Sequence, residues 1–305
     1  MTITARHYTN EQDLSKMESI LTAGWKADSD AYYLHVGDLR WWLFFMDSDS
    51  CQDHLCLWEW GSDPMGWSLL SPTWRTFDVF VRPEMRGRAL EAKIMLWAEE
   101  CLSGIVQTHG GANIRMMWVN ESDVLRTRWL EMRGFNRSAF FMRVLHRTLD
   151  EPLPETQLPH SYTIHRVNGE QEVRQRATVS HAAFGSSRAF ESYQQRMLNF
   201  MRSPVYRNVQ DLVTVAPDGR FASFCIIWPD PVTKVGLFEP VGTHPDFQHK
   251  GLGKAIVTEG LRRLQAQGMK QAIVCTEYNN PAALKLYESA GFHLIHKLYT
   301  FEKTI

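Results

Sequence analysis

The sequence predicts a mixed protein of the α/β or α+β class that is built from two similar halves. The chain has 305 residues, a length that suggests about two domains, and 44% of them are apolar, which suffices for a core in each. A strand, a turn and a helix follow one another at two places, and a Gly-Phe pair at 134–135 is repeated at 291–292. Both halves share one coarse order: a strand, one or two helices, a meander of strands, the turn and helix, a strand, a helix and a last strand.

A short linker is expected between the halves. Residues 151–160 contain Pro152, Pro154 and Pro159, and prolines interrupt regular structure. We therefore place one domain at 1–150 and the other at 161–305.

In the first half, the run Pro83–Glu91 aligns with Pro245–Gly253 of the second half. Further along, Asp123 through Gly134-Phe135 aligns with Asn280 through Gly291-Phe292. The spacing between the two patterns differs by only five residues between the copies, which a loop absorbs. The chain is thus predicted to be a tandem duplication.

In the second half, residues 235–243 are expected to form a strand. The turn Gln248-His249-Lys250-Gly251-Leu252-Gly253 follows, and its two glycines leave the backbone open to close approach. The next segment, 254–267, is expected to be an amphipathic helix that Gly268 ends. Its apolar face would carry Ile256, Val257, Gly260, Leu261 and Leu264. A glycine-bearing turn that opens a helix aims free N–H groups at one point, which suits a pyrophosphate.

The second half resembles the GNAT superfamily of N-acetyltransferases. The turn Gln248–Gly253 matches that family's Q/R-x-x-G-x-G/A pattern. Its second signature, N-x-x-A-x-x-x-Y-x-x-x-G-F, is matched by Asn280, Ala283, Tyr287, Gly291 and Phe292. The resemblance extends from about Tyr162 to the last residue. It implies two tandem GNAT-like domains, each a mixed, mostly antiparallel and splayed sheet flanked by helices.

The resemblance also implies acetyl-CoA as the co-substrate and no metal. Backbone N–H groups from about Gln248 to Lys254 would hold the pyrophosphate, with Lys250 and Lys254 adding charge unless they are only solvated. Donors for the acetyl oxygen would come from the strand before the turn, where Gly242 suits a bulge and Pro240 has no N–H. The expected cofactor contacts are Val241, Gly242, Thr243, Gln248, His249, Lys250, Gly251, Leu252, Gly253, Lys254, Asn280, Ala283 and Tyr287.

Two residues are expected to carry the chemistry. The resemblance places Tyr287 where the family protonates the departing sulfur, although a tyrosine that only packs its helix remains the alternative. An alkylamine is neutral in about one molecule in 10³ at neutral pH, so a base has to accept its proton. Glu239 is the leading candidate, followed by Glu277 and His244, and each could instead be a surface charge. Asn280 could bind the pantetheine arm or simply cap the helix that begins at Pro281.

The first copy lacks the features that cofactor binding and chemistry need. Ala89 and Glu91 stand where the second copy has Gly251 and Gly253, and Leu130 replaces Tyr287. A carboxylate at 91 would repel a dianionic pyrophosphate. We therefore expect one acetyl-CoA site per chain, in the second half.

Aromatic residues are concentrated in the first half, and their role is left open. They could line an acceptor pocket or form the core of that half, and the core is the favoured interpretation. The residues are Trp25, Tyr32, Tyr33, Trp41, Trp42, Trp58, Trp60, Trp67 and Trp74. His35 and Asp38 lie in a turn-like segment that could face the acceptor, but a structural role is favoured.

Composition limits the partners and the compartment. Thirty-three Lys and Arg against 34 Asp and Glu give a formal charge of −1, so no field favours nucleic acid. Five cysteines without CxxC spacing suggest reduced thiols in a cytoplasmic protein, not a zinc site or a disulfide framework. No stretch is apolar enough to span a membrane. A monomer or a homodimer is expected.

The favoured function is acetyl transfer to the amine of a small molecule. Two alternatives remain open: acetylation of a peptide or protein amine, and a non-catalytic sensor that binds acyl-CoA or another ligand. The sequence does not name the acceptor or the pathway.

Overall fold

The computed structural model describes residues 3–27, 32–48, 51–153, 155 and 157–305. The chain forms two compact units. The first comprises residues 1–143 with 296–305, and the second comprises 144–295. Within the linker expected at 151–160, residues 154 and 156 lie outside the described part of the chain.

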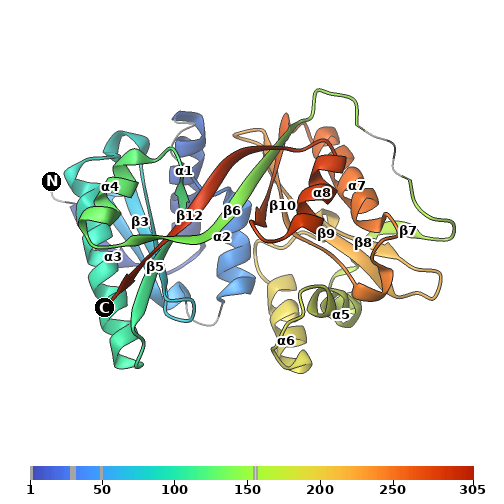
Figure 1. Ribbon diagram of the computed structural model, residues 1–305, viewed down its shortest axis with the longest axis horizontal. Coiled ribbons are helices and arrows are strands. Elements are labelled where there is room, and N and C mark those ends of the chain that lie inside the picture. The colour runs from blue at the N-terminus through green and yellow to red at the C-terminus, as the bar shows by residue number, and fades with distance from the viewer. Residues whose placement is uncertain (1–2, 28–31, 49–50, 154, 156) are drawn as a thin grey trace. The chain divides into compact units, whose positions relative to one another are not determined.

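The first unit contains a mixed sheet with helices on both faces (Figure 1). Its strands run in the order β1-β2-β3-β4-β5-β12, and only β4 and β5 pair in parallel. The elements are β1 Ile3–His7, α1 Glu11–Ala27, α2 Val36–Trp41, β2 Leu55–Trp60, β3 Asp63–Ser71, β4 Thr76–Val81, α3 Ala89–Thr108, β5 Asn113–Asn120, α4 Val124–Met132 and the first part of β6 Asn136–Thr148.

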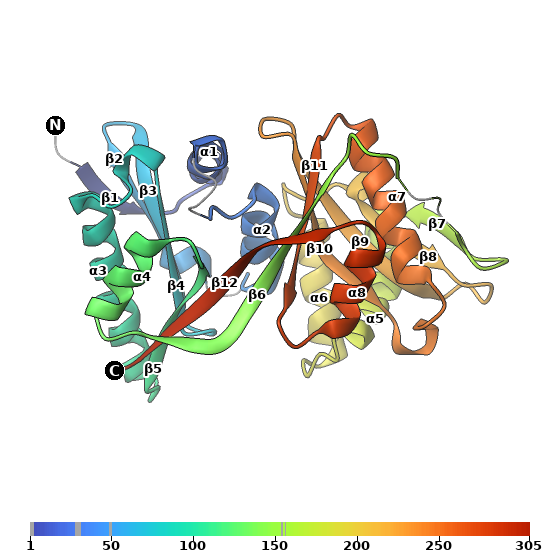
Figure 2. The same ribbon diagram turned by 45° about the horizontal axis from the view of Figure 1, so that its top comes forward.

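The second unit repeats this architecture (Figure 2). Beside the end of β6, its strands run in the order β11-β10-β9-β8-β7, and β10 and β11 are the parallel pair. The elements are β7 Thr163–Arg166, α5 Val173–Ala183, α6 Phe190–Met201, β8 Asp211–Val215, β9 Phe221–Asp230, β10 Val235–Thr243, α7 Leu252–Ala266, β11 Gln271–Glu277, α8 Pro281–Ser289 and the first residues of β12 His293–Thr304.

The two compact units differ from the halves expected from the sequence in the assignment of their last strands. The C-terminal part of β12 pairs with β5, from Leu298 opposite Asn120 to Thr304 opposite Asn113, and so belongs to the first unit. Conversely, Leu145 and Leu149 of the first sequence half pack in the core of the second unit. Each unit therefore receives one strand segment from the other half of the sequence. A single domain boundary at 151–160 cannot describe this exchange.

Opposite faces of each sheet receive different helices because neighbouring strand residues point to opposite sides. In β3, the Trp67 indole donates a hydrogen bond to the Met17 carbonyl of α1, whereas the preceding residue, Gly66, lies against Ile94 of α3. In β9, Phe224 lies toward α5 and Cys225 contacts Ile256 of α7. Each unit thus has a sheet between two helical layers.

The repeat extends to the ends of the helices. Asp123 accepts a hydrogen bond from the Arg126 N–H, at 3.1 Å, and so caps α4. Asn280 caps α8 in the same way, through the Ala283 N–H at 3.0 Å. Both helices have nine residues, and each is followed by a glycine of positive φ and a buried phenylalanine. The predicted duplication is therefore visible in three dimensions.

Most aromatic side chains of the first unit belong to its core. Tyr32, Tyr33, Trp41, Trp58 and Trp67 are each at most 6% exposed, which supports the core interpretation of the sequence. Two others, Trp60 and Trp74, are exposed.

His35 and Asp38 have a structural role. The imidazole of His35 accepts the Gly37 N–H, and the Asp38 carboxylate accepts the His35 N–H, so together they form a capping box at the start of α2. None of the helices in the described part of the chain is both long and apolar enough to cross a bilayer.

A buried acid in β4 makes the stability of the protein depend on pH. Asp78 is 5% exposed, and its Oδ1 has no hydrogen-bond partner among the described residues. Burial raises the pKa of the Asp78 carboxyl well above its usual value, and the nearby charge of Arg126 opposes this only in part. The folded protein thus keeps a proton that the unfolded chain releases near pH 4.

Folding stability should therefore fall as pH rises from about 4 toward the raised pKa of Asp78. The Asp78→Asn variant removes the ionisable group, so its stability relative to the wild type should improve from pH 4 to pH 8. Urea unfolding at several pH values measures this difference, and Asp63→Asn, at an exposed position, is the control. A difference between Asp78→Asn and wild type that does not change with pH would contradict the prediction.

Candidate active site

Strand β10 loses one neighbour halfway along its length. It pairs in parallel with β11 from Val235 opposite Gln271 to Phe238 opposite Val274, and the described pairing ends there. On its other edge it stays paired with β9 as far as Thr243 opposite Ser223. The second half of β10, residues 239–243, therefore has one open edge.

The backbone N–H groups on this open edge follow from the alternation of the strand. The His244 N–H donates to the Ala222 carbonyl, at 2.9 Å, on the β9 side. Since successive N–H groups alternate between the two edges, Gly242 also faces β9, whereas Val241 and Thr243 face the open edge. Both residues are among the cofactor contacts expected from the sequence.

The bulge in β10 lies earlier than expected. Phe238 is opposite Ile227 and Val241 is opposite Cys225, so the extra residue falls at Glu239-Pro240. Gly242, in contrast, is paired with Phe224, and a Cβ atom there would lie 2.5 Å from the Phe224 ring. The glycine is required by this packing and not by a bulge.

The turn before α7 carries a series of uncommitted N–H groups. Among the described residues, no hydrogen bond uses the backbone N–H of any residue from 249 to 254. His249 and Gly251 have φ of 61° and 79°, and Gly251 is the residue that precedes the helix. N–H groups in such alternating conformations at a helix start form a concave site for an anion. The helix begins at Leu252, two residues before the expected Lys254.

The surroundings of the turn keep it open. The Gln248 side chain donates to the Thr243 carbonyl, at 3.4 Å, and so ties the turn to the open end of β10. At Gly253 a Cβ atom would lie 3.3 Å from both the Leu286 side chain and the Thr243 hydroxyl. Lys250 and Lys254 are exposed, and the ammonium of Lys250 lies 5.2 Å from the centre of the Phe247 ring.

The corresponding turn of the first unit is filled by a side chain of the protein. The Glu91 carboxylate accepts the Gly87 N–H at 2.7 Å, and it lies 3.0 Å from the Arg126 guanidinium and 3.3 Å from that of Arg86. Arg86 also pairs with Asp123. These charged groups are at least nine-tenths buried. Glu91 thus fills the turn of the first unit, whereas Gly253, at the matching position of the second unit, has no side chain that could do so.

The sequence identified Glu91 but not its partners. Arg86 precedes the turn glycine, and Arg126 lies three residues after the Asp123 cap. A basic residue on each side of an acid at a helix start was the available sign of this network.

Tyr287 lies in the core of the second unit. It is 5% exposed, and its ring packs against Phe292 with 6.0 Å between the centres. Burial raises the pKa of the Tyr287 phenol above its usual value, and the nearby charge on Glu239 acts in the same direction. The phenol is therefore protonated at neutral pH. In the first unit Leu130, fully buried, takes the same place on α4.

The three candidate bases differ in their surroundings. Glu239 is half-buried beside the bulge, close enough to Tyr287 for the charge of one to affect the pKa of the other. Glu277 is exposed at the end of β11. His244 uses its Nδ1 to accept the Asp246 N–H and so caps the short helix Pro245–Phe247. This structural hydrogen bond makes His244 the weakest candidate.

Asn280 caps a helix, which is one of the two roles considered for it. Its side-chain oxygen is used to cap α8, which leaves the amide nitrogen for another partner. Ala283, the residue that donates to this cap, lies in the first turn of the helix and packs against the core of the second unit.

Comparisons with known proteins show what this chain is similar to. The model of the acetyltransferase (GNAT) family matches residues 180–292. Mycothiol acetyltransferase from Streptomyces coelicolor is 30% identical over 152 residues, which are 50% of this chain and 49% of that protein. The one from Thermobispora bispora is 23% identical over 240 residues, 76% of this chain and 77% of the relative. In the relatives of higher similarity, the match spans about half of their length.

Solved structures share the fold over the whole chain. A tandem GNAT protein from the clavulanic acid biosynthesis pathway superposes with a TM-score of 0.72 at 13% identity, covering 99% of this chain and 98% of the other. A GCN5-related N-acetyltransferase from Sphaerobacter thermophilus gives 0.68 at 19% identity, covering 99% and 95%. Residues 180–292 therefore match the GNAT acetyltransferase family, and the chain as a whole has the fold of a tandem GNAT protein.

Proposed function

We propose that the second unit transfers the acetyl group of acetyl-CoA to the amine of a small molecule, and that the first unit binds no acetyl-CoA. The observation that carries this proposal is the contrast between the two turns. The N–H groups of residues 249–254, next to the open edge of β10, have no partner among the described residues, whereas the turn at 86–91 is closed by the Glu91 carboxylate.

Acetyl-CoA would use two sets of backbone donors. The N–H groups of residues 249–254 suit the pyrophosphate, because they converge at the positive end of α7. The N–H groups of Val241 and Thr243 suit the acyl end, where an oxyanion develops when an amine adds to the thioester carbon. The uncommitted amide nitrogen of Asn280 can donate to the arm between these two ends.

The side chains would move the protons. The neutral amine attacks the thioester carbon, the carbon–sulfur bond breaks, and the thiolate takes a proton from the Tyr287 phenol. Glu239 accepts the proton that the amine loses, directly or through water. A phenol of raised pKa keeps its proton until the thiolate forms.

The acceptor is proposed to be a small amine, not a protein. Relatives named mycothiol acetyltransferase support this class, since their name refers to a small molecule. Acetylation of a peptide or protein amine is the second candidate, and a silent acyl-CoA sensor is the third. Release of coenzyme A with a panel of small amines and peptides separates the three, because a sensor binds the thioester without turnover.

A carboxylate introduced into the second turn should reproduce the closed state of the first. In Gly253→Glu, the negative charge is expected to weaken acetyl-CoA binding about 100-fold or more. Gly253→Gln introduces a side chain of the same size without the charge and should lower the affinity for acetyl-CoA by about tenfold or less. Calorimetric titration should show one site in the wild type and in Gly253→Gln, and none in Gly253→Glu. A site that persists in Gly253→Glu would place acetyl-CoA elsewhere.

Removal of the Tyr287 hydroxyl tests the proposed role of this residue as the general acid. Tyr287→Phe should lower kcat by about 10–10³-fold and leave the affinity for acetyl-CoA nearly unchanged, because only the proton donor is lost. Steady-state kinetics and calorimetry measure the two quantities. Tyr162→Phe, which removes a phenol outside the proposed site, is the control. Full activity of Tyr287→Phe would leave this residue with a packing role only.

The base is tested through the pH dependence of the reaction. Glu239→Gln should lower kcat/KM by about 10²–10⁴-fold and change the rising limb of the pH–rate profile. The matched change Glu277→Gln, on the neighbouring strand, should leave that limb in place. If the profile of Glu239→Gln is the same as that of the wild type, Glu239 is not the base.

A further inference from the structure

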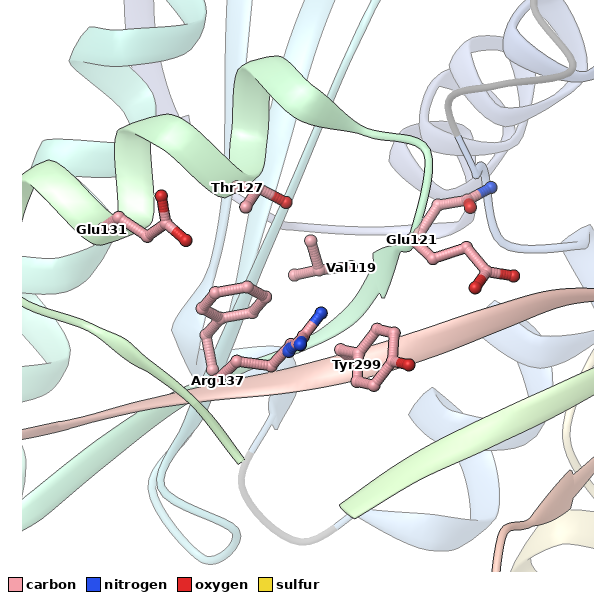
Figure 3. Close-up of a pocket in the computed structure, with 8 residues that line it drawn as sticks. Val119, Glu121, Thr127, Glu131, Arg137 and Tyr299 are labelled. Atoms are coloured by element: carbon pink, nitrogen blue, oxygen red, sulfur yellow. The ribbon is translucent and has the colours of Figure 1, made fainter. Parts of the chain in front are cut away.

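A cavity of about 430 Å³ lies in the first unit, outside the proposed acetyl-transfer site (Figure 3). Its size is within the range of about 300–1,000 Å³ that is usual for small-molecule sites. It opens between α4, the end of β5 and the strands β6 and β12. The lining consists of Val119, Asn120, Glu121, Thr127, Glu131, Arg137, Tyr299 and Phe301.

A positive charge in this cavity is held without a carboxylate partner. The Arg137 guanidinium stacks over the Tyr299 ring, 4.6 Å from its centre, and Tyr299 in turn packs against Phe141. Among the described residues, no acidic oxygen lies within 4.0 Å of this guanidinium. Stacking orients the planar group and leaves its edge free for two parallel hydrogen bonds to a carboxylate.

Negative charge lies in the same cavity. Glu131 of α4 has no ion pair among the described residues, and it is exposed toward the opening. Glu121 is partly committed, since its carboxylate accepts the Lys297 N–H at 3.0 Å. Figure 3 shows the Glu131 carboxylate and the Arg137 guanidinium as separate groups that both belong to the lining. Opposite charges are thus present but not paired with each other.

A buried amide in the lining also lacks a partner. Asn120 is 1% exposed, and its side-chain oxygen accepts the Ser122 N–H at 3.0 Å, which fixes the orientation of the amide. Its nitrogen Nδ2 has no hydrogen-bond partner among the described residues. A buried donor without an acceptor is unfavourable, so a ligand that supplies an acceptor gains from meeting it.

We propose that this cavity binds a small zwitterion of the amino-acid or short-peptide class. The carboxylate of the ligand would pair with Arg137 and accept from Asn120, and its ammonium group would pair with Glu131. Phe301 and Val119, both buried, provide the apolar surface between these groups. The proposal does not depend on acetyl transfer, because none of these residues belongs to the site in the second unit.

Binding to the full-length protein tests the proposal by calorimetry or ligand-observed NMR. The probes are L-alanine, L-alanyl-L-alanine, N-acetyl-L-alanyl-L-alanine and L-alanyl-L-alanine amide. At least one of the two zwitterions should bind, and the choice between them distinguishes an amino acid from a peptide. The two blocked dipeptides, which lack one charge each, should bind about tenfold or more weakly than the zwitterionic dipeptide. Equal binding of all four probes, or no binding of either zwitterion, would overturn the proposal.

Variants assign the two charges separately. Arg137→Gln should remove the preference for a free carboxylate, and Glu131→Gln the preference for a free ammonium group. Asn120→Asp keeps the acceptor for the Ser122 N–H but replaces the free donor with a carboxylate oxygen. This change should lower the affinity for the zwitterion about tenfold or more. Arg128→Gln and Glu100→Gln, at exposed positions outside the lining, are the controls. Unchanged affinity in both Arg137→Gln and Glu131→Gln would refute the assignment even if a zwitterion binds.

Discussion

The backbone N–H groups at the turn before the long helix of each unit lie at the positive end of that helix, where negative charge is favoured, and the two units differ in what faces them. In the first unit the protein supplies the acceptor itself, because the Glu91 carboxylate bonds to the Gly87 N–H. In the second unit the N–H groups of residues 249–254 have no acceptor among the described residues. The same piece of backbone is thus a structural contact in one copy, whereas in the other it leaves the N–H groups that we propose to bind an anion.

The residues around the two turns differ as well. Arg86 and Arg126 both pair with Glu91 in the closed turn, and Arg126 lies in the first turn of α4, three residues after the Asp123 cap. In the open copy the residue that matches Arg126 is Ala283, and Gly253 leaves Leu286 and Thr243 close to the backbone. Removal of one member of this buried group of four charges would leave its partners uncompensated, so the four residues depend on one another.

The two units also use the helix after β5 or β11 differently. In the second unit Tyr287 combines core packing with a phenol that remains protonated, whereas Leu130 only packs. On the outer side of α4, however, the first unit has acquired the charged and aromatic lining of a cavity. The absence of an acetyl-CoA site and the presence of a zwitterion site, both proposed above, are compatible on the same helix, since residues 126 and 130 face the core while 127 and 131 line the cavity.

Local patterns in the sequence were sufficient to predict the duplication, the strand 235–243 and the helix that Gly268 ends. They also indicated a capping role for Asn280. These features depend on residues close together in the chain, where periodicity, proline and glycine act directly. The exchange of strand segments between the units, the position of the bulge at Glu239-Pro240, and the packing need for Gly242 were decided only in the tertiary structure. So were the arginines around Glu91 and the cavity beside Arg137, because each of these brings together residues from strands and helices that are distant in sequence.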